Sequence, residues 1–189
     1  MAIRDIIRMG HPTLRTPAQP VSRSQLGSPA FEALLEDMVD TLASSGGIGL
    51  AAPQIDVPLC LALIDLPGGP SRYGELPTIP STFFVNPTIE VVDPAAAGYW
   101  EGCLSVPGLR GFVERPQHIR VRALTQTGEP LERVFTGFAA TVIQHEFDHL
   151  IGHLYIDHVK DPRLLMFEAE YDRFVVNAED SSPSKEREA

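Results

Sequence analysis

The chain has 189 residues, of which 43% are hydrophobic and 21% are charged, and its formal net charge is −10. This composition is ordinary for a globular protein, and the length is sufficient for one domain with a core of its own. The negative charge argues against stable binding to nucleic acid or to anionic lipid, because both of these partners are themselves negatively charged.

The cysteine count and the absence of long apolar runs restrict the location of the protein. Cys60 and Cys103 are the two cysteines of the chain, too few for a disulfide scaffold. No apolar run approaches the ~20 residues that a membrane-spanning helix needs. The N-terminal residues also lack the charged-then-apolar pattern of a secretion signal. We therefore expect a cytoplasmic protein without a membrane partner.

The N-terminal part of the chain predicts an extended segment followed by a helix. Residues 1–27 carry three prolines and only scattered apolar positions. Ser28 is a suitable N-cap, and a proline follows it at the first helical position. Apolar residues then recur from Phe31 to Leu42 at spacings of three and four, which is typical of one buried helical face. Gly46 is expected to end this helix.

The middle of the chain has the pattern of β-structure. A continuous apolar run predicts a buried strand, and alternating apolar and polar residues predict half-buried ones. Residues 67–80 are dense in glycine and proline and predict a surface loop. The strands expected are 59–66, 83–85, 89–92 (separated from 83–85 at Asn86-Pro87), 118–124 and 131–135.

Two helices are expected in the C-terminal part. The first covers residues 137–150 and ends near Gly152, and the second runs from Asp161-Pro162 to about residue 176. Strands followed by helices favour an α+β fold, with mixed or antiparallel strands packed around the helix 137–150. Residues 1–176 would form a single catalytic domain. Residues 177–189 are polar and acidic, and we expect this tail to be disordered.

The helix 137–150 contains two histidines with metal-ligand spacing. His145 and His149 are four residues apart, so both side chains stand on one face of the helix and can reach one metal ion. Glu146 lies about 100° around the helix from His145, beside the position of a metal-bound water. Two ligands and a base on one turn are typical of metal-assisted hydrolysis.

A catalytic metal needs a third protein ligand, and the residues alone leave alternatives. Tyr155 occupies the position where one hydrolase class has a third histidine. Glu168 and Glu170 have the spacing that another class uses. Cys103 is the remaining candidate, because a thiolate binds divalent transition metals strongly, although free cysteines are usually small buried hydrophobic residues.

The other candidate ligands have simpler interpretations. Cys60 lies in an apolar strand and is expected to be a buried packing residue. Four further histidines lie in loops, near helix ends or at the start of a strand, and we expect them to be surface or hydrogen-bonded residues: His11, His118, His153 and His158.

Three separated stretches, taken together, resemble the peptide deformylase family. They are the loop Gly-Ile-Gly-Leu-Ala-Ala-Pro-Gln at 47–54, Glu-Gly-Cys-Leu-Ser at 101–105, and His-Glu-Phe-Asp-His at 145–149. A glycine-rich loop alone is a weak signal, but three linked motifs are specific. The resemblance covers most of residues 5–160. It implies hydrolysis of the N-formyl group from the initiator methionine of new polypeptides, with release of formate.

The resemblance also implies a ligand set and catalytic roles. Cys103, His145 and His149 would hold one divalent metal, most often Fe(II), with zinc, nickel or cobalt tolerated. Glu146 would take a proton from water and deliver it to the leaving amine. The Gln54 side-chain amide and the Leu104 backbone N–H would stabilise the negative charge that develops on the formyl oxygen.

A substrate pocket is expected beside the predicted metal. Phe138, Thr141 and Val142 lie seven, four and three residues before His145, so they share its helical face. We expect them to line an apolar pocket for an unbranched methionine side chain, with core packing as the simpler role for Phe138 and Val142. From the opposite loop, Ile48 and Leu50 would add apolar wall and Gly49 would offer backbone hydrogen bonds.

Three charged residues are expected to support the ligands. Arg115 is predicted to pair with Glu101 or Asp148 and so to brace the Cys103 stretch against the helix.

The alternatives to a deformylase are a thermolysin-like endopeptidase that uses Glu168, and a catalytically silent metal-binding protein that holds nascent chains. The expected partners are N-formylmethionyl nascent peptides and, through them, the ribosome.

Overall fold

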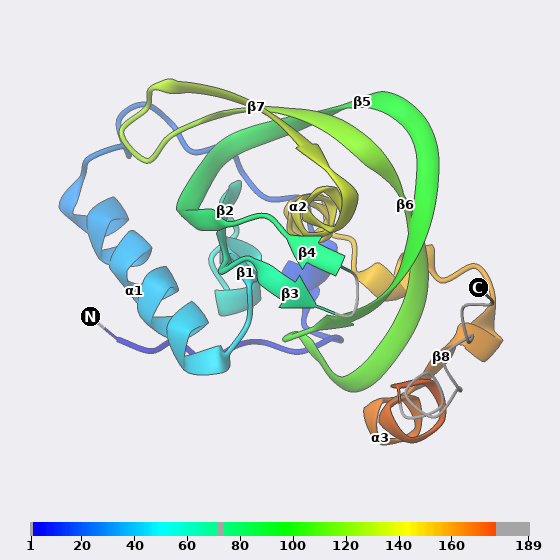
Figure 1. Ribbon diagram of the computed structural model, residues 1–189. Coiled ribbons are helices and arrows are strands. Elements are labelled where there is room, and N and C mark those ends of the chain that lie inside the picture. The colour runs from blue at the N-terminus through cyan, green and yellow to red at the C-terminus, as the bar shows by residue number, and fades with distance from the viewer. Residues whose placement is uncertain (1, 72–73, 177–189) are drawn as a thin grey trace.

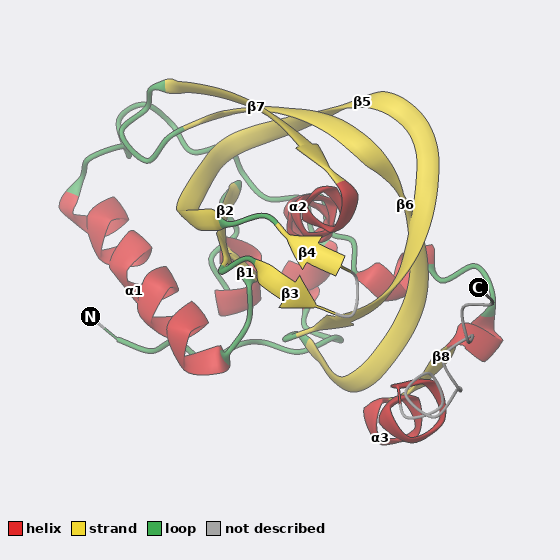
Figure 2. Cartoon of the chain, in the orientation of Figure 1, coloured by secondary structure: helices red, strands yellow, loops and turns green. Residues whose placement is uncertain are grey.

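A long curved sheet surrounds one central helix (Figures 1 and 2). The computed structural model describes residues 2–71 and 74–176. Helix α1, Pro29–Ser45, begins at the N-cap Ser28, whose side chain accepts a hydrogen bond from the Phe31 backbone N–H. It ends at Gly46, which has a left-handed φ of 68°. The predicted limits of this helix are confirmed, because capping is local chemistry.

The main sheet is antiparallel and has the order β1-β2-β5-β6-β7, with β8 added beside β6. A separate two-stranded hairpin pairs β3 with β4. The strand bounds are β1 Gly49–Ala51, β2 Leu61–Leu66, β3 Gly69–Ser71, β4 Gly74–Leu76, β5 Ile79–Cys103, β6 Val106–Leu124, β7 Pro130–Thr136 and β8 Leu165–Phe167.

Strands β5 and β6 form one long hairpin that bends around the domain (Figure 1). Its register shifts at several points, including Val85 to Thr88 and Glu101 to Cys103. Such bulges bend a strand and increase its twist. The predicted break at Asn86-Pro87 is therefore wrong: β5 continues through it as a bulge, and the Asn86 side chain hydrogen-bonds the backbone N–H and carbonyl of Val21 at 2.8 Å each.

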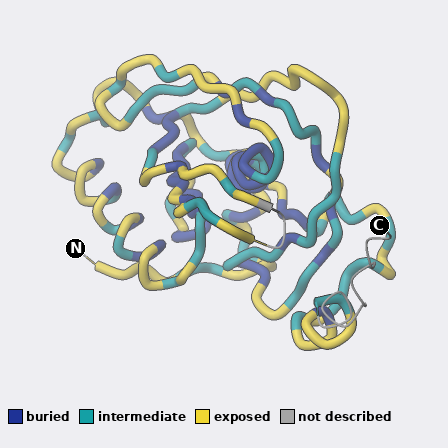
Figure 3. The backbone as a smooth tube through the Cα atoms, in the orientation of Figure 1, coloured by how far each residue is buried: buried dark blue, intermediate teal, exposed yellow. Residues whose placement is uncertain are grey.

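The sheet separates two apolar clusters. Along β2, Leu61 and Leu63 pack with α1 on one face, whereas Ala62 and Ile64 pack with the central helix on the other. Burial on both faces explains why this strand is a continuous apolar run rather than an alternating one. Figure 3 shows the deepest burial at the central helix, which is therefore held from several sides.

The central helix is α2, Gly137–Leu150, with the predicted limits. The chain turns away after it at Gly152, which has a φ of 79°. Ten of the fourteen residues of α2 are buried, including its two histidines and Glu146. Antiparallel strands around a helix, with further helices toward both ends of the described chain, confirm the α+β fold class.

Two local predictions are wrong. Residues 67–80 contain the β3–β4 hairpin in addition to loop. The helix expected from Asp161 to residue 176 is broken up, because Leu165–Phe167 pairs with β6 as strand β8. What remains is a 3-10 turn at Pro162–Leu164, the short helix α3 at Glu168–Tyr171 and a π-helical turn at Asp172–Val176. Pairing with an available strand outweighed the local helical preference.

The predicted single domain, residues 1–176, remains a prediction. The acidic tail, residues 177–189, lies outside the described residues. Within the described chain, no helix has the length and apolar character needed to cross a membrane.

Candidate metal centre

Helix α2 holds both histidines and the adjacent glutamate inside the domain. His145 is 9% exposed, Glu146 6% and His149 0%. The two imidazole rings stand edge to face with centroids 5.3 Å apart, as expected one helical turn apart. A buried pair of imidazoles on one face is the arrangement that can share a single ion.

Cys103 reaches the same point from the sheet. It is the last residue of β5, directly after the register shift that begins at Glu101. Its Sγ lies 3.4 Å from Nε2 of His149, and one ligand atom from each of Cys103, His145 and His149 lies within 4.8 Å of the others. A soft thiolate with two imidazoles is a donor set that suits Zn²⁺, Fe²⁺ and neighbouring transition metals, so the residues fit such an ion.

The surroundings favour a thiolate and a basic carboxylate. Burial alone would raise the pKa of the Cys103 thiol. The charges of His149 and His145, and their hydrogen bonds to the sulfur, outweigh this effect and lower the pKa to about 5. Burial raises the pKa of Glu146. The Oε2 atom of Glu146 is buried and makes no hydrogen bond to any described residue. A carboxylate with these properties can accept a proton.

A buried group of charges orients His145. Its Nδ1–H donates to Oε2 of Glu101 at 2.7 Å, which leaves Nε2 as the ligand atom. Arg115, 4% exposed, donates to both oxygens of Glu101 at 2.7 and 3.1 Å. Its third hydrogen bond goes to Oδ2 of Asp148 at 2.8 Å. Arg115 therefore joins the Cys103 strand to α2 through both of its predicted acidic partners.

Gln54 presents an amide N–H to the same centre. Its Oε1 accepts from the Ala51 backbone N–H at 2.8 Å, which fixes the side chain and directs Nε2 the other way. Nε2 lies 3.6 Å from the Cys103 Sγ and 3.3 Å from the Ser105 Oγ. Leu104 lines the same pocket, next in the chain after Cys103. An amide N–H thus lies close to the Cys103 sulfur, and the residue that follows Cys103 lines the same pocket.

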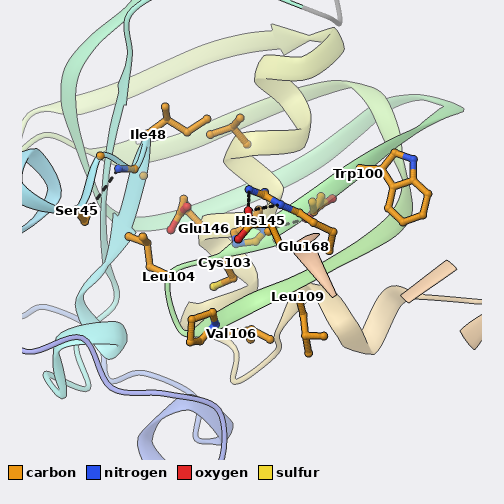
Figure 4. A pocket seen from close by; sticks show the side chains of 18 of the residues that line it. Ser45, Ile48, Trp100, Cys103, Leu104, Val106, Leu109, His145, Glu146 and Glu168 are labelled. Carbon is orange, nitrogen blue, oxygen red and sulfur yellow. Dashed lines mark hydrogen bonds and ion pairs between the residues drawn. The ribbon is translucent and has the colours of Figure 1, made fainter. Parts of the chain in front are cut away.

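A pocket of about 590 Å³ opens beside this cluster (Figure 4). Its lining includes five of the six residues expected to bind substrate: Ile48, Gly49, Phe138, Thr141 and Val142. Gly49 faces Glu146 so closely that a Cβ at this position would lie 2.4 Å from Oε1 of that carboxylate. The absence of a side chain at Gly49 therefore makes room for the buried glutamate.

Leu50 is the exception, and its predicted place in the pocket wall is wrong. It is 0% exposed and packs in the α1 cluster. Successive side chains of a strand point to opposite faces. Because Gly49 faces Glu146, Leu50 must face the other side of the sheet.

The pocket also has walls that the sequence did not indicate. Trp100, Leu109 and Arg110 line it from β5 and β6, and Glu168 does so from the start of α3. Arg110 forms an ion pair with Glu168, and this contact depends on the pairing of β8 with β6. Nothing in the local sequence connects two residues so far apart along the chain.

Tyr155 is not a histidine and cannot complete the predicted ligand set, but it contacts the centre in another way. Its ring is stacked on that of His145, with centroids 5.9 Å apart and planes inclined by 17°. It is 1% exposed. The tyrosine therefore limits how far the imidazole of His145 can tilt.

Comparison with known proteins agrees with this geometry. A family model described as "Polypeptide deformylase" matches residues 3–164. A "Peptide deformylase" of Leptospira biflexa is 40% identical over 172 residues, covering 91% of this chain and 96% of the relative. A "Peptide deformylase 2" of Pseudomonas syringae pv. tomato is 45% identical over 159 residues, covering 84% of this chain and 88% of the relative.

Solved structures agree as well. A class I type b peptide deformylase from Acinetobacter baumannii, crystallised with bound Met-Ala-Ser, has a TM-score of 0.75 and 34% identity. The alignment covers 83% of this chain and 99% of that one. On the strength of the matched family model, the sequence identities and the shared fold, the chain belongs to the polypeptide deformylase family.

Proposed function

We propose that Cys103, His145 and His149 hold one divalent metal ion, with Fe(II) favoured and zinc, nickel or cobalt also accepted. Support comes from the convergence of the three ligand atoms within 4.8 Å and from the carboxylate that orients His145. Bound there, the ion would supply Lewis-acid chemistry, polarising the formyl carbonyl and making water acidic enough to attack at neutral pH.

The chain is a deformylase, a hydrolase that removes the formyl group from nascent peptides, and Glu146 is the residue to which we assign its proton transfers. The observation that carries this assignment is a buried, unpaired Oε2 beside the three ligand atoms, with a pKa raised by burial. Glu146 would take a proton from the attacking water and pass it to the methionine nitrogen as the formyl carbon–nitrogen bond breaks.

We assign to Gln54 and Leu104 the stabilisation of the negative charge that develops on the formyl oxygen. Gln54 is 1% exposed and held at its Oε1, so its N–H is already oriented before substrate arrives. Such preorganised donors act strongly because they need no rearrangement during the reaction. The Leu104 backbone N–H is adjacent to the ligand Cys103 and would serve as the second donor.

The methionine side chain is assigned to the apolar part of the pocket, between Ile48, Phe138 and Val142. Strand β1 is the terminal strand of the sheet, so one edge of its backbone is not occupied by β2. Gly49 can therefore pair with an extended peptide by β-strand addition. The Acinetobacter baumannii relative was crystallised with a short peptide, Met-Ala-Ser, bound to it. The substrates we expect are nascent chains that leave the ribosome in the cytoplasm.

Neither alternative has a supporting observation. The endopeptidase hypothesis needs Glu168 as a ligand, but its carboxylate is paired with Arg110. Glu170 is exposed on α3. A silent binding protein would not need a buried, unpaired glutamate next to the ligand atoms.

The test is formate release from formyl-Met-Ala-Ser by protein loaded anaerobically with Fe(II). Glu146→Gln should retain the metal and lose about 10²–10⁴-fold in kcat, because it cannot transfer the proton. Glu170→Gln is the matched control, an exposed glutamate outside the site, and should behave as the wild type. Cys103→Ser should lose metal while Glu168→Gln keeps it. Metal loss in Glu168→Gln, or full activity in Glu146→Gln, would contradict the assignment.

A further inference from the structure

The end of α2 carries a second group of potential ligands, next to the catalytic ones. Asp148 follows His145 by three residues and precedes His149 by one, so its side chain points about 60° from the first and about 100° from the second around the helix axis. After Leu150 the chain turns at Gly152, and the His153 backbone N–H donates to the Asp148 carbonyl at 2.9 Å. This turn brings His153 back beside Asp148.

The turn is held in place by its neighbours. A Cβ at Gly152 would lie 2.8 Å from the Arg15 carbonyl carbon, so the backbone there packs directly against the N-terminal segment. A 3-10 helix at Tyr155–His158 follows, and the Asp157 carboxylate accepts from the Leu154 backbone N–H at 2.8 Å. The position of His158 is therefore set by fixed backbone rather than by a free loop.

His158 completes the group. Its Nε2 lies 3.0 Å from Oδ2 of Asp148, and its ring centroid lies 6.1 Å from that of His153. One ligand atom from each of Asp148, His153 and His158 lies within 4.8 Å of the others. The Nε2 atom of His158 is buried, yet its approach to Asp148 is not a hydrogen bond of good geometry.

We propose that Asp148, His153 and His158 form a second metal site that binds one first-row transition ion such as Zn²⁺. Two imidazoles and a carboxylate are a donor set for these ions, and Mg²⁺ and Ca²⁺ prefer oxygen ligands alone. His153 is exposed, so an ion can enter from solvent on its side of the group. The two ligand groups share no residue.

Arg115 would compete with a metal ion for the carboxylate of Asp148. It also contacts Oδ2 of Asp148, at 2.8 Å, and its positive charge opposes a nearby cation. Its charge is already balanced by Glu101, which accepts two hydrogen bonds from it. The charge of Asp148 is therefore available to an ion as well as to Arg115.

The test is a Zn²⁺ titration of the holoenzyme, after the catalytic site has been filled. The expected result is a saturable second equivalent per chain by calorimetry and metal analysis, which Mg²⁺ does not reproduce. His153→Ala and His158→Ala should each bind only the first equivalent. The matched control is His118→Ala, which changes a histidine of β6 outside the group and should keep both equivalents.

A second measurement on the wild type removes any dependence on how the variants fold. In ¹⁵N spectra of the imidazoles, the second equivalent of Zn²⁺ should shift the signals of His153 and His158 and leave His118 unchanged. The proposal is overturned if the holoenzyme binds no second equivalent, or if the histidine variants retain it with unchanged affinity. Either result would leave the group as an ion pair only, without bearing on the catalytic site.

Discussion

Replacing Arg115 by methionine tests whether the buried charges hold the metal centre together. The substitution keeps an unbranched chain of similar reach but removes the guanidinium, which makes hydrogen bonds of 2.7, 3.1 and 2.8 Å to Glu101 and Asp148. Glu101 is 6% exposed and would keep only His145 as a side-chain partner among the residues that the structure describes. A buried carboxylate that loses its counter-charge is costly, because solvent cannot replace the lost interaction.

The expected loss of stability follows from the burial of this ion pair. Breaking a buried ion pair costs about 3–5 kcal/mol. In a protein of this size, each kcal/mol lowers the midpoint of thermal unfolding by about 2–4 °C, so the midpoint should fall by roughly 10 °C. Because Glu101 also orients His145, metal affinity should fall about 10–100-fold. Thermal unfolding of the metal-free protein and chelator competition measure the two effects separately.

Arg122→Met is the matched control for Arg115→Met. Arg122 lies on the same strand and also contacts two carboxylates, those of Glu90 and Glu132, but its side chain is 54% exposed. Solvent screens such pairs, so its midpoint should remain close to the wild type. Equal midpoints for Arg115→Met and the wild type would refute the bracing role of Arg115. Equal losses in the two variants would show that burial does not matter.

Three further changes test the centre itself. Gln54→Leu should keep the metal and lose about 10²–10³-fold in kcat, because one oxyanion donor is removed; normal turnover would exclude that role. Gly49→Ala adds a Cβ that would lie 2.4 Å from Oε1 of Glu146 and so would displace the carboxylate, and kcat should fall with little change in metal content. An unchanged kcat would mean that the carboxylate can move without consequence. In metal-free protein, the Cys103 thiol should be deprotonated above about pH 5, so its alkylation by iodoacetamide should rise through that pH and then level off. Cys60, whose thiol pKa is raised by burial, should react only in alkaline solution; a midpoint for Cys103 near that of an ordinary thiol, ~8.5, would contradict the prediction.

Elements with local signals were predictable from the sequence. The limits of α1 follow from the cap at Ser28 and the left-handed Gly46, and α2 ends before the left-handed Gly152. The two histidines and Glu146 could be placed on one helix because helical spacing is fixed by the backbone. The family assignment is confirmed, since it rests on three motifs that are each contiguous in the chain.

Features that depend on strand pairing were not predictable. The continuation of β5 through Asn86-Pro87 requires the side-chain contact with Val21, 65 residues away. Strand β8 replaced residues 165–167 of an expected helix because the edge of β6 was available for pairing. The sequence also did not show which residues of β1 face the pocket. A shift of one residue exchanges the two faces of a strand, and for this reason Leu50 was wrongly expected in the pocket wall.

The sequence by itself determined the chemistry of this protein: which residues can ligate, which can accept a proton, and which family it belongs to. Only the tertiary structure decided how distant residues meet. It brought Cys103 at the end of β5 to the two histidines of α2, paired Arg110 with Glu168, and gathered Asp148, His153 and His158 beside one another. The physical reason is that backbone geometry fixes neighbours within a helix, whereas contacts between elements depend on register and on burial across the whole chain.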